Sequence, residues 1–499
     1  MAPDAAFDPE ASPDTADRDA LQQDLALGPI IAAMAAGDPV IERVARAALM
    51  TAPATEPAQT RYRQSLLADC RQHPVMIRRL YEHTGAVLAA RRHGLNARLA
   101  TVVIRHAANQ LTGTIDGLSR VRDELAACRQ ELQSPGLLTL AADLDAHLNA
   151  EAVATMQRHL HALRRGRAYR VSARLGTGNK GVGYRLRCGE SRRGSWRRWL
   201  APRRGGYRLA IDPDDERYRT ALRAFREERL APLSQSLKAI AQDAEATLAQ
   251  LRDELAFYVG CLNLEDELAR LGVATTVPTV LSPDAGAWQG RGLVDAALAL
   301  TARSGVVAND LAADNCRTIV VTGANRGGKT TFLRSLGQMQ LMGQTGCVVA
   351  AEGAMLSARD VVLTHFPRPE DAGLDRGKLD EELARLSDCV ERLTPRALLL
   401  SNESCAVTNQ REGARILQDV ATALHAHGAH AVYVTHLHEF AAALAAWHDS
   451  HRLMLRAART PDGLRSYRIV PGEPETTTHA YDLFERIIGV GGGTPSGPV

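Results

Sequence analysis

The chain has 499 residues, and its 60 lysines and arginines nearly balance its 57 aspartates and glutamates, for a net charge of +3 at pH 7. This length exceeds what one hydrophobic core usually organises, so we expect two to four domains. Hydrophobic residues make up 45% of the chain, as in ordinary globular proteins, and no apolar run approaches the roughly 20 residues of a membrane span. The sequence therefore gives no indication of a membrane role.

The first segment of the chain, residues 1–20, is rich in Asp, Ala and Pro and has no hydrophobic periodicity. We expect a disordered tail there. Because this segment is acidic rather than basic and then apolar, it is unlike a secretory signal, and we expect a cytoplasmic location. The eight cysteines are scattered singly, without the paired spacing of a zinc site.

A helical pattern runs from residue 21 to about residue 161 and predicts an all-α region. Residues 169–186 then alternate around a Gly-rich turn, and residues 207–211 read as another short strand, which predicts a small β insertion. Fifteen lysines or arginines and a single acid lie between Arg164 and Arg208. Such density favours nucleic acid as a partner, because cationic side chains displace counterions from phosphates. A solvated arginine loop is the alternative.

A long helix is expected after the acidic run at residues 212–215, because apolar residues recur at steps of three and four from Leu233 to Leu262. Such a stripe predicts a seam against an antiparallel partner helix, which we place around residues 125–163. Two long helices with a β tip would form an arm. Pro278 and Pro283 then mark a linker before an α/β pattern.

The most informative stretch is a P-loop, residues 323–331, which follows an apolar run at residues 318–321 and precedes a helical pattern. A triphosphate needs unobstructed backbone N–H groups, a positive charge near its β/γ oxygens and a hydroxyl for Mg²⁺. Glycines clear the approach, Lys329 supplies the charge, and Thr330 supplies the hydroxyl. The residues expected to contact ATP are Gly323, Ala324, Asn325, Arg326, Gly327, Gly328, Lys329, Thr330 and Thr331.

Two further strands of the α/β region end in polar residues. The apolar run at residues 397–400 leads to Asn402 and Glu403, and the run at residues 431–434 leads to His436. Glu403 is placed to polarise an attacking water, and His436 to sense the γ-phosphate. An ordinary surface residue is the alternative for a lone Glu or His, but the P-loop upstream favours the functional interpretation.

Together these residues resemble the MutS family of DNA mismatch repair ATPases. The P-loop resembles the family's TGPNMGGKST, the strand before Glu403 resembles its LLxDE, and residues 306–310 resemble the segment before its P-loop. Asn179 to Leu186 is similar to the strand of the MutS clamp that touches DNA. The resemblance implies a homodimer that binds duplex or branched DNA, and that encloses each ATP between one subunit's P-loop and the other's signature. The residues that we expect to contact DNA are Lys180, Tyr184, Arg192, Arg193, Arg197 and Arg198.

The chain also departs from the family. We expect no counterpart of the mismatch-reading domain that precedes the core in full-length MutS, since the pattern of the core and lever begins near residue 21. The trans-acting signature is replaced by Arg376, Gly377 and Lys378, in which Lys378 would contact the partner's γ-phosphate. Asn402 stands where the family has Asp, so Thr330 and Asn402 would hold Mg²⁺ with less negative charge. We therefore expect slow turnover.

We predict a multidomain α and α/β protein: an all-α core and lever with a basic β clamp insertion, followed by an ABC-type P-loop ATPase. The expected boundaries are a tail at 1–20, the core and lever at 21–275 with the insertion at about 165–211, the ATPase at 276–490 and a flexible tail at 491–499. The predicted function is an ATP-dependent, dimeric DNA clamp in repair or recombination. The alternatives are a nucleotide switch or scaffold with little hydrolysis, and an ABC transporter ATPase subunit, which would lack the arm.

Overall fold

The computed structural model contains helices and strands throughout the described part of the chain. The described residues are 15–50, 56–90, 99–164, 169–175, 177, 181–188, 216–303, 305–368, 377–406, 408–447, 449–460 and 465–474. Within them, no helix combines the length and the apolar character needed to cross a membrane.

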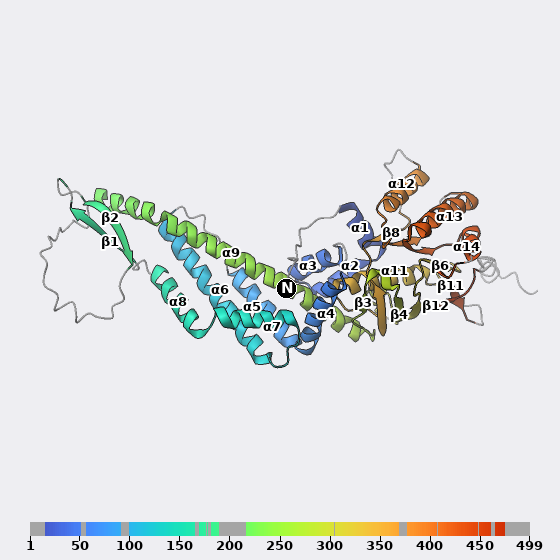
Figure 1. Cartoon of the computed structure of the whole chain (residues 1–499), viewed down its shortest axis with the longest axis horizontal. Coiled ribbons are helices and arrows are strands. Elements are labelled where there is room, and N and C mark those ends of the chain that lie inside the picture. Colours follow the sequence, from blue (N-terminus) through green and yellow to red (C-terminus); the bar gives the residue numbers. More distant parts are fainter. Residues whose placement is uncertain are drawn as a thin grey trace, which may run out of the picture. The chain divides into compact units, whose positions relative to one another are not determined.

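The chain forms two compact units, and Figure 1 labels most of their elements. Unit 1 combines residues 1–74, 133–136 and 256–499, and unit 2 combines residues 75–132 and 137–255. Unit 1 thus joins the first helices of the chain to the region of the P-loop, whereas the sequence grouped those helices with the core and lever.

Unit 2 is made of helices and one hairpin. Its elements are α5 (Pro74–Ala89), α6 (Ala100–Cys128), α7 (Pro135–His147), α8 (Ala150–Arg164), β1 (Tyr169–Leu175), β2 (Gly181–Cys188) and α9 (Glu216–Arg270), which continues into unit 1. The stripe on α9 packs against a partner, as its spacing predicts. Ile104 and Ala107 at the start of α6 form a cluster with Leu230 and Leu237, and Leu163 packs against it, so the partner includes the start of α6 as well as the end of the expected range of 125–163. Stripe spacing shows that a helix has a partner but does not identify it.

The β insertion contains an antiparallel hairpin, with Tyr169 paired to Cys188 and Leu175 paired to Gly181. The register shifts between Ser172 and Arg174, which marks an irregularity in the ladder. The turn and the strand expected at residues 207–211 lie outside the described residues.

Unit 1 carries two sheets. Its helices and strands are α1 (Thr15–Asp24), α2 (Leu27–Ala35), α3 (Pro39–Met50), α4 (Pro57–Gln72), β3 (Thr279–Leu281), β4 (Trp288–Leu293), α10 (Ala296–Ala302), β5 (Asn309–Ala312), β6 (Thr318–Thr322), α11 (Lys329–Thr345), β7 (Gly353–Ser357), β8 (Val362–His365), α12 (Lys378–Glu391), β9 (Leu398–Asn402), α13 (Gln410–His427), β10 (His430–Val434), α14 (His438–Ala445), β11 (Arg452–Arg459) and β12 (Arg465–Pro471).

The larger sheet has the order β12-β11-β6-β10-β9-β8, parallel except for β12. Helix α11 lies between one face of this sheet and the smaller sheet β3-β7-β4-β5, and touches strands of both. Helices α13 and α14 pack with Leu399 and Tyr433 on the other face. Burial on both faces explains why β6, β9 and β10 read as continuous apolar runs. Because parallel strands end at one edge, the P-loop and the residues after β9 and β10 are brought to the same edge.

Helix α1 begins at Thr15, inside the range expected to be a disordered tail. Its end is fixed by contacts that are distant in sequence. Arg368 pairs with the buried Asp24 over 2.6 Å and donates a hydrogen bond to Gln23 over 2.9 Å. Burial raises the pKa of Asp24, which the Arg368 charge opposes. Tertiary contacts therefore order a segment whose composition alone indicates disorder.

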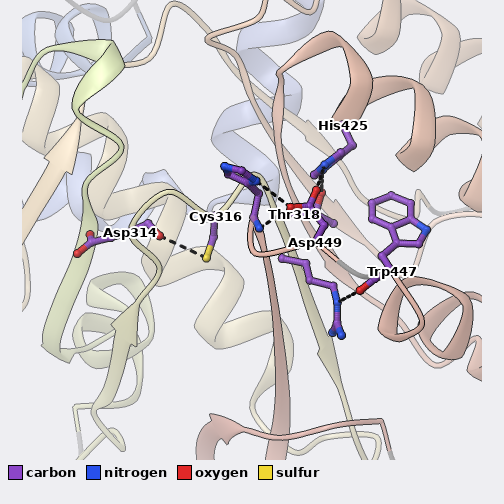
Figure 2. Close-up of polar contacts among 8 residues, drawn as sticks. Asp314, Cys316, Thr318, His425, Trp447 and Asp449 are labelled. Carbon is purple, nitrogen blue, oxygen red and sulfur yellow. Dashed lines mark hydrogen bonds and ion pairs between the residues drawn. The ribbon is translucent and has the colours of Figure 1, made fainter.

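A polar cluster lies at the opposite, amino-terminal edge of the large sheet, and Figure 2 shows its side chains and their polar contacts. His425 lies between Thr318 at the start of β6, 3.0 Å away, and Asp449, 2.5 Å away. Asp449 also accepts a hydrogen bond from the backbone of His451, and these bonds hold the pKa of Asp449 at about 2. Thr318 is only 2% exposed, so the bonds through His425 and Asp449 attach the segment before β11 to a buried residue of β6.

Candidate nucleotide site

The P-loop connects β6 to α11, and its backbone requires glycine at three points. Gly323 has φ +114° and Gly328 has φ +93°, values that L side chains rarely adopt. At Gly327 an added Cβ would come within 2.9 Å of the carbonyl oxygen of Ala324. The loop therefore presents its backbone without side chains in the way, directly before the amino terminus of α11, as an anion site needs.

Lys329 is the first residue of α11, and it is held inside the loop. Its side chain is 4% exposed, and Nζ donates hydrogen bonds to the carbonyl oxygens of Gly323 at 2.8 Å and Ala324 at 3.1 Å. Burial lowers the pKa of Lys329, while the charge of Glu403 opposes that shift. The ammonium group thus lies where a phosphate oxygen could replace the carbonyls, with Glu403 nearby.

Thr330 and Asn402 connect the P-loop to the end of β9. The Thr330 hydroxyl donates a hydrogen bond to Oδ1 of Asn402 over 3.0 Å. Asn402 is 8% exposed, so its amide is fixed rather than free in solvent. Both oxygens retain lone pairs, which makes this pair the most suitable place for Mg²⁺, although it offers no negative charge.

Glu403 follows Asn402 in a strained conformation. Its φ of +51° lies in the left-handed region that non-glycine residues seldom occupy, and such residues concentrate at functional sites. Its backbone N–H donates to the carbonyl oxygen of Val434 in β10 over 2.7 Å. Glu403 lines the same cavity as Lys329 and Thr330. Its carboxylate is therefore near the phosphate-binding elements.

His436 comes after β10, as its sequence position predicts. The residue before it, Thr435, donates its backbone N–H to Val321 in β6, and accepts a bond from the backbone of Leu437. His436 is half-buried and is not among the residues that line the cavity. Its role as a γ-phosphate sensor stays a prediction.

A cavity of about 460 Å³ extends from the P-loop. Its wall consists of Leu298, Ala302, Gly305, Val306, Val307, Asn309, Arg326, Gly327, Gly328, Lys329, Thr330, Thr331, Glu403 and Tyr467. The lining thus combines polar and cationic residues of the P-loop with apolar residues of α10 and of the segment before β5. A volume of a few hundred Å³ with such walls is typical of small-molecule sites.

Tyr467 is one of several lining residues that sequence reasoning missed. It lies in β12, is 47% exposed, and has φ +58°. Its backbone is fixed by Asn309, whose amide donates to the Tyr467 carbonyl over 3.2 Å and whose Oδ1 accepts from the N–H of Ile469 over 2.7 Å. Nothing in the local pattern of β12 indicates this position, since it depends on the fold of the β11–β12 hairpin.

Gly323, Ala324 and Asn325 of the P-loop and Gly377 and Lys378 of the predicted signature do not line this cavity. Gly377 precedes α12 in an extended conformation, and Lys378 begins the helix, but Arg376 lies outside the described residues. In the clamp region Tyr184 lies in β2. Lys180, Arg192, Arg193, Arg197 and Arg198 fall outside the described part of the chain.

Comparison with known families supports the resemblance to MutS independently of the geometry of the site. Residues 55–271 match the model of the MutS2 N-terminal domain, and residues 319–482 match that of MutS domain V. The chain belongs to the MutS family. Domain V is the family's ATPase domain.

Individual relatives of this MutS-family chain are similar over part of its length. "DNA mismatch repair protein MutS 2" of Halobacterium salinarum is 30% identical over 182 residues, 36% of this chain and 21% of that protein. "Endonuclease MutS2" of Listeria monocytogenes is 30% identical over 213 residues, 42% of this chain and 27% of that protein. "DNA mismatch repair protein MutS" of Dehalococcoides mccartyi is 33% identical over 138 residues, 27% of this chain and 16% of that protein. The matches thus span no more than about a quarter of these relatives.

Proposed function

We propose that this MutS-family chain is an ATP-dependent DNA-binding protein, in which the nucleotide state gates a homodimeric clamp used in DNA repair or recombination. The observation that carries the proposal is the convergence of Lys329, Thr330 and Glu403 on one cavity beside Asn402. A cation for phosphates, two oxygens for a metal and a carboxylate for water are the parts that phosphoryl transfer to water requires.

The chain's own groups divide the work of ATP hydrolysis. The P-loop N–H groups and Lys329 bind the β- and γ-phosphates, which stabilises charge that builds up on them. Glu403 accepts a proton from the attacking water, and His436 contacts the γ-phosphate. Mg²⁺, bound by Thr330 and, directly or through water, by Asn402, would neutralise phosphate charge.

The apolar part of the cavity lining is suited to a nucleotide base. Val306 and Val307 line the cavity, and Tyr467 adds an aromatic side chain that is 47% exposed. Bases stack well on aromatic rings, and apolar walls accept their faces. We therefore assign the adenine to this part of the lining, with the phosphates towards Lys329.

DNA binding and dimerisation rest on the family and on the charge of the insertion. The arginines between residues 164 and 208 lie, in the sequence, within and on either side of strands β1 and β2. The start of α12, with Lys378, would contact ATP bound to the partner subunit. Nucleotide occupancy would then bring two clamps together around duplex or branched DNA.

A nucleotide switch with little hydrolysis is the second candidate, and Asn402 favours it. The Asn402 amide is already bonded to Thr330 and contributes no charge to a metal. Such a protein would bind ATP, dimerise and hold DNA without appreciable turnover.

Replacement of Lys329 by Ala tests the proposal. The variant should lose ATP affinity by roughly a hundredfold or more, because the glycine framework remains but its charge is gone. Lys238→Ala, at an exposed position of α9, is the matched control and should bind ATP as wild type does. Titration with a fluorescent ATP analogue measures both. Equal affinity in all three proteins would refute the nucleotide site, and wild type that binds ATP but never DNA would favour the transporter-subunit alternative.

A further inference from the structure

The loop that bears Glu403 is strained on both sides of one buried residue. Glu403 and Cys405 both have positive φ, +51° and +57°, and Ser404 between them is 2% exposed. A left-handed backbone costs energy at each residue that carries a Cβ, and here two such residues lie close together. The surrounding structure must therefore hold this backbone in place, and the groups that do so determine where the Glu403 carboxylate points.

Helix α12 supplies one of these groups. Oε1 of Glu382 accepts a hydrogen bond from the backbone N–H of Cys405 over 2.7 Å. Glu382 is 3% exposed, and its other oxygen, Oε2, has no hydrogen-bond partner among the described residues. A buried carboxyl group with one unsatisfied oxygen is costly, so this single contact to the loop is a specific feature rather than incidental surface chemistry.

A second set of bonds joins the same helix to Ser404. His365 at the end of β8 contacts the Ser404 hydroxyl through Nδ1 at 2.5 Å and the Glu382 carbonyl oxygen through Nε2 at 3.3 Å. The Ser401 hydroxyl lies 2.7 Å from that of Ser404. Burial lowers the pKa of His365 to about 4, so the ring is neutral at pH 7. Its Nε2–H then donates to the carbonyl oxygen of Glu382, and its Nδ1 accepts from the hydroxyl of Ser404. The donor and the acceptor of both hydrogen bonds are thus defined.

Glu382 is also close in sequence to the start of the helix that carries the signature. Helix α12 begins at Lys378, about one turn before Glu382, so any displacement of its first turn is passed to the Cys405 N–H. On the other side the loop is fixed to β10 through the Glu403 N–H. One anchor is thus part of the central sheet, and the other is on a peripheral helix.

We propose that Glu382 is a positioning residue for Glu403: by holding the Cys405 N–H it orients the loop for hydrolysis and ties turnover to the position of α12. This inference rests on the proposed ATPase function. Glu382 itself does not line the nucleotide cavity, so its removal affects the hydrolytic step and leaves the binding of ATP intact.

The test compares three substitutions in the full-length chain. Glu382→Gln keeps an oxygen acceptor for Cys405, whereas Glu382→Met has similar length and lacks it. We expect Glu382→Met to lower kcat by roughly tenfold to a hundredfold, since a misplacement of about 1 Å can have such an effect. KM and the Kd for ATP should stay within about twofold, and Glu382→Gln should restore kcat to within about threefold of wild type. Glu382→Asp retains the carboxylate on a shorter side chain, and its kcat should be as low as that of Glu382→Met.

Each outcome decides the matter. A wild-type kcat in Glu382→Met overturns the positioning role. A parallel loss of kcat and of ATP affinity in both Glu382→Met and Glu382→Gln also overturns it, because such a loss indicates a general structural role. If Glu382→Met does not fold, Glu382→Asp against Glu382→Gln gives the same comparison. If wild-type protein binds ATP but does not hydrolyse it, the hydrolytic function itself fails, and this inference falls with it.

Discussion

The hydroxyl of Thr330 donates a hydrogen bond to Oδ1 of Asn402 over 3.0 Å, which joins the first turn of the P-loop helix to the end of the neighbouring strand. The contact places the two expected Mg²⁺ ligands side by side, with an amide where the family has a carboxylate. A neutral ligand at this point accounts for the slow turnover that we expect.

Asn402→Asp should therefore raise kcat, by roughly tenfold if the added charge contributes about 1.4 kcal/mol at the transition state. Asn409→Asp is the matched control, because Asn409 caps α13 and Asp caps equally well. Steady-state phosphate release measures both. A flat or reduced kcat in Asn402→Asp would place the metal elsewhere. Glu352, which pairs with Arg291, and Glu412, which accepts a hydrogen bond from Thr408, do not line the cavity and therefore do not supply the missing charge.

Tyr467→Ala should weaken ATP binding by roughly tenfold, since stacking of a base on an aromatic ring contributes about 1–3 kcal/mol. The hydrogen bonds of Asn309 to the backbone of residues 467 and 469 do not need the side chain, so the hairpin should persist. Tyr467→Phe keeps the ring and should bind as wild type does. A fluorescent analogue titration distinguishes them, and inorganic triphosphate should bind all three equally. Unchanged ATP affinity in Tyr467→Ala would remove the base from this part of the cavity lining.

The stability of unit 1 should fall as the pH drops below the ordinary pKa of histidine. Nδ1 of His430 accepts a hydrogen bond from the buried Arg359 over 2.8 Å, and burial, reinforced by Arg359, lowers the pKa of His430 to about 3. The unfolded chain takes up a proton near pH 6.5, whereas the folded chain does not until about pH 3. The free energy of unfolding therefore decreases as pH falls through this window.

Between pH 7 and pH 5 we expect His430 to contribute about 2 kcal/mol of this loss, from about 1.36 kcal/mol per pH unit. His430→Asn retains an acceptor for Arg359 but does not titrate, so its urea midpoint should depend less on pH. Midpoints at pH 7 and pH 5 for both proteins provide the measurement. Identical pH dependence would mean that His430 is protonated in the folded protein.

Replacement of Arg192, Arg193, Arg197 and Arg198 by Ala should weaken binding to all DNA sequences alike. The slope of log K against log salt should become shallower by roughly 0.9 for each phosphate that the variant no longer neutralises. Binding of ATP to the same variant serves as the internal control and should be unchanged. Full DNA affinity with an unaltered salt slope would show that these arginines form a solvated loop.

The parts of the site that could be predicted are those set by short sequence stretches. In the P-loop a strand, glycines and a helix follow one another, and parallel strands must end at a common edge of the sheet. The proximity of Lys329 and Glu403 could therefore be predicted from the sequence alone. Tyr467 and Glu382 could not, because their positions depend on a hairpin register and on where α12 packs. The same reason applies to helix α1, since Arg368, which bonds to Gln23 near its end, is more than 300 positions away in the sequence.

The central claim is that this chain hydrolyses ATP with Glu403 as the general base. The most direct test is a comparison of ATP binding and single-turnover hydrolysis in wild type and Glu403→Gln, with Mg²⁺ present. We predict equal ATP affinity within about twofold and a hydrolysis rate at least roughly a hundredfold lower in the variant, the usual contribution of a general base. Hydrolysis at the wild-type rate in Glu403→Gln would contradict the account.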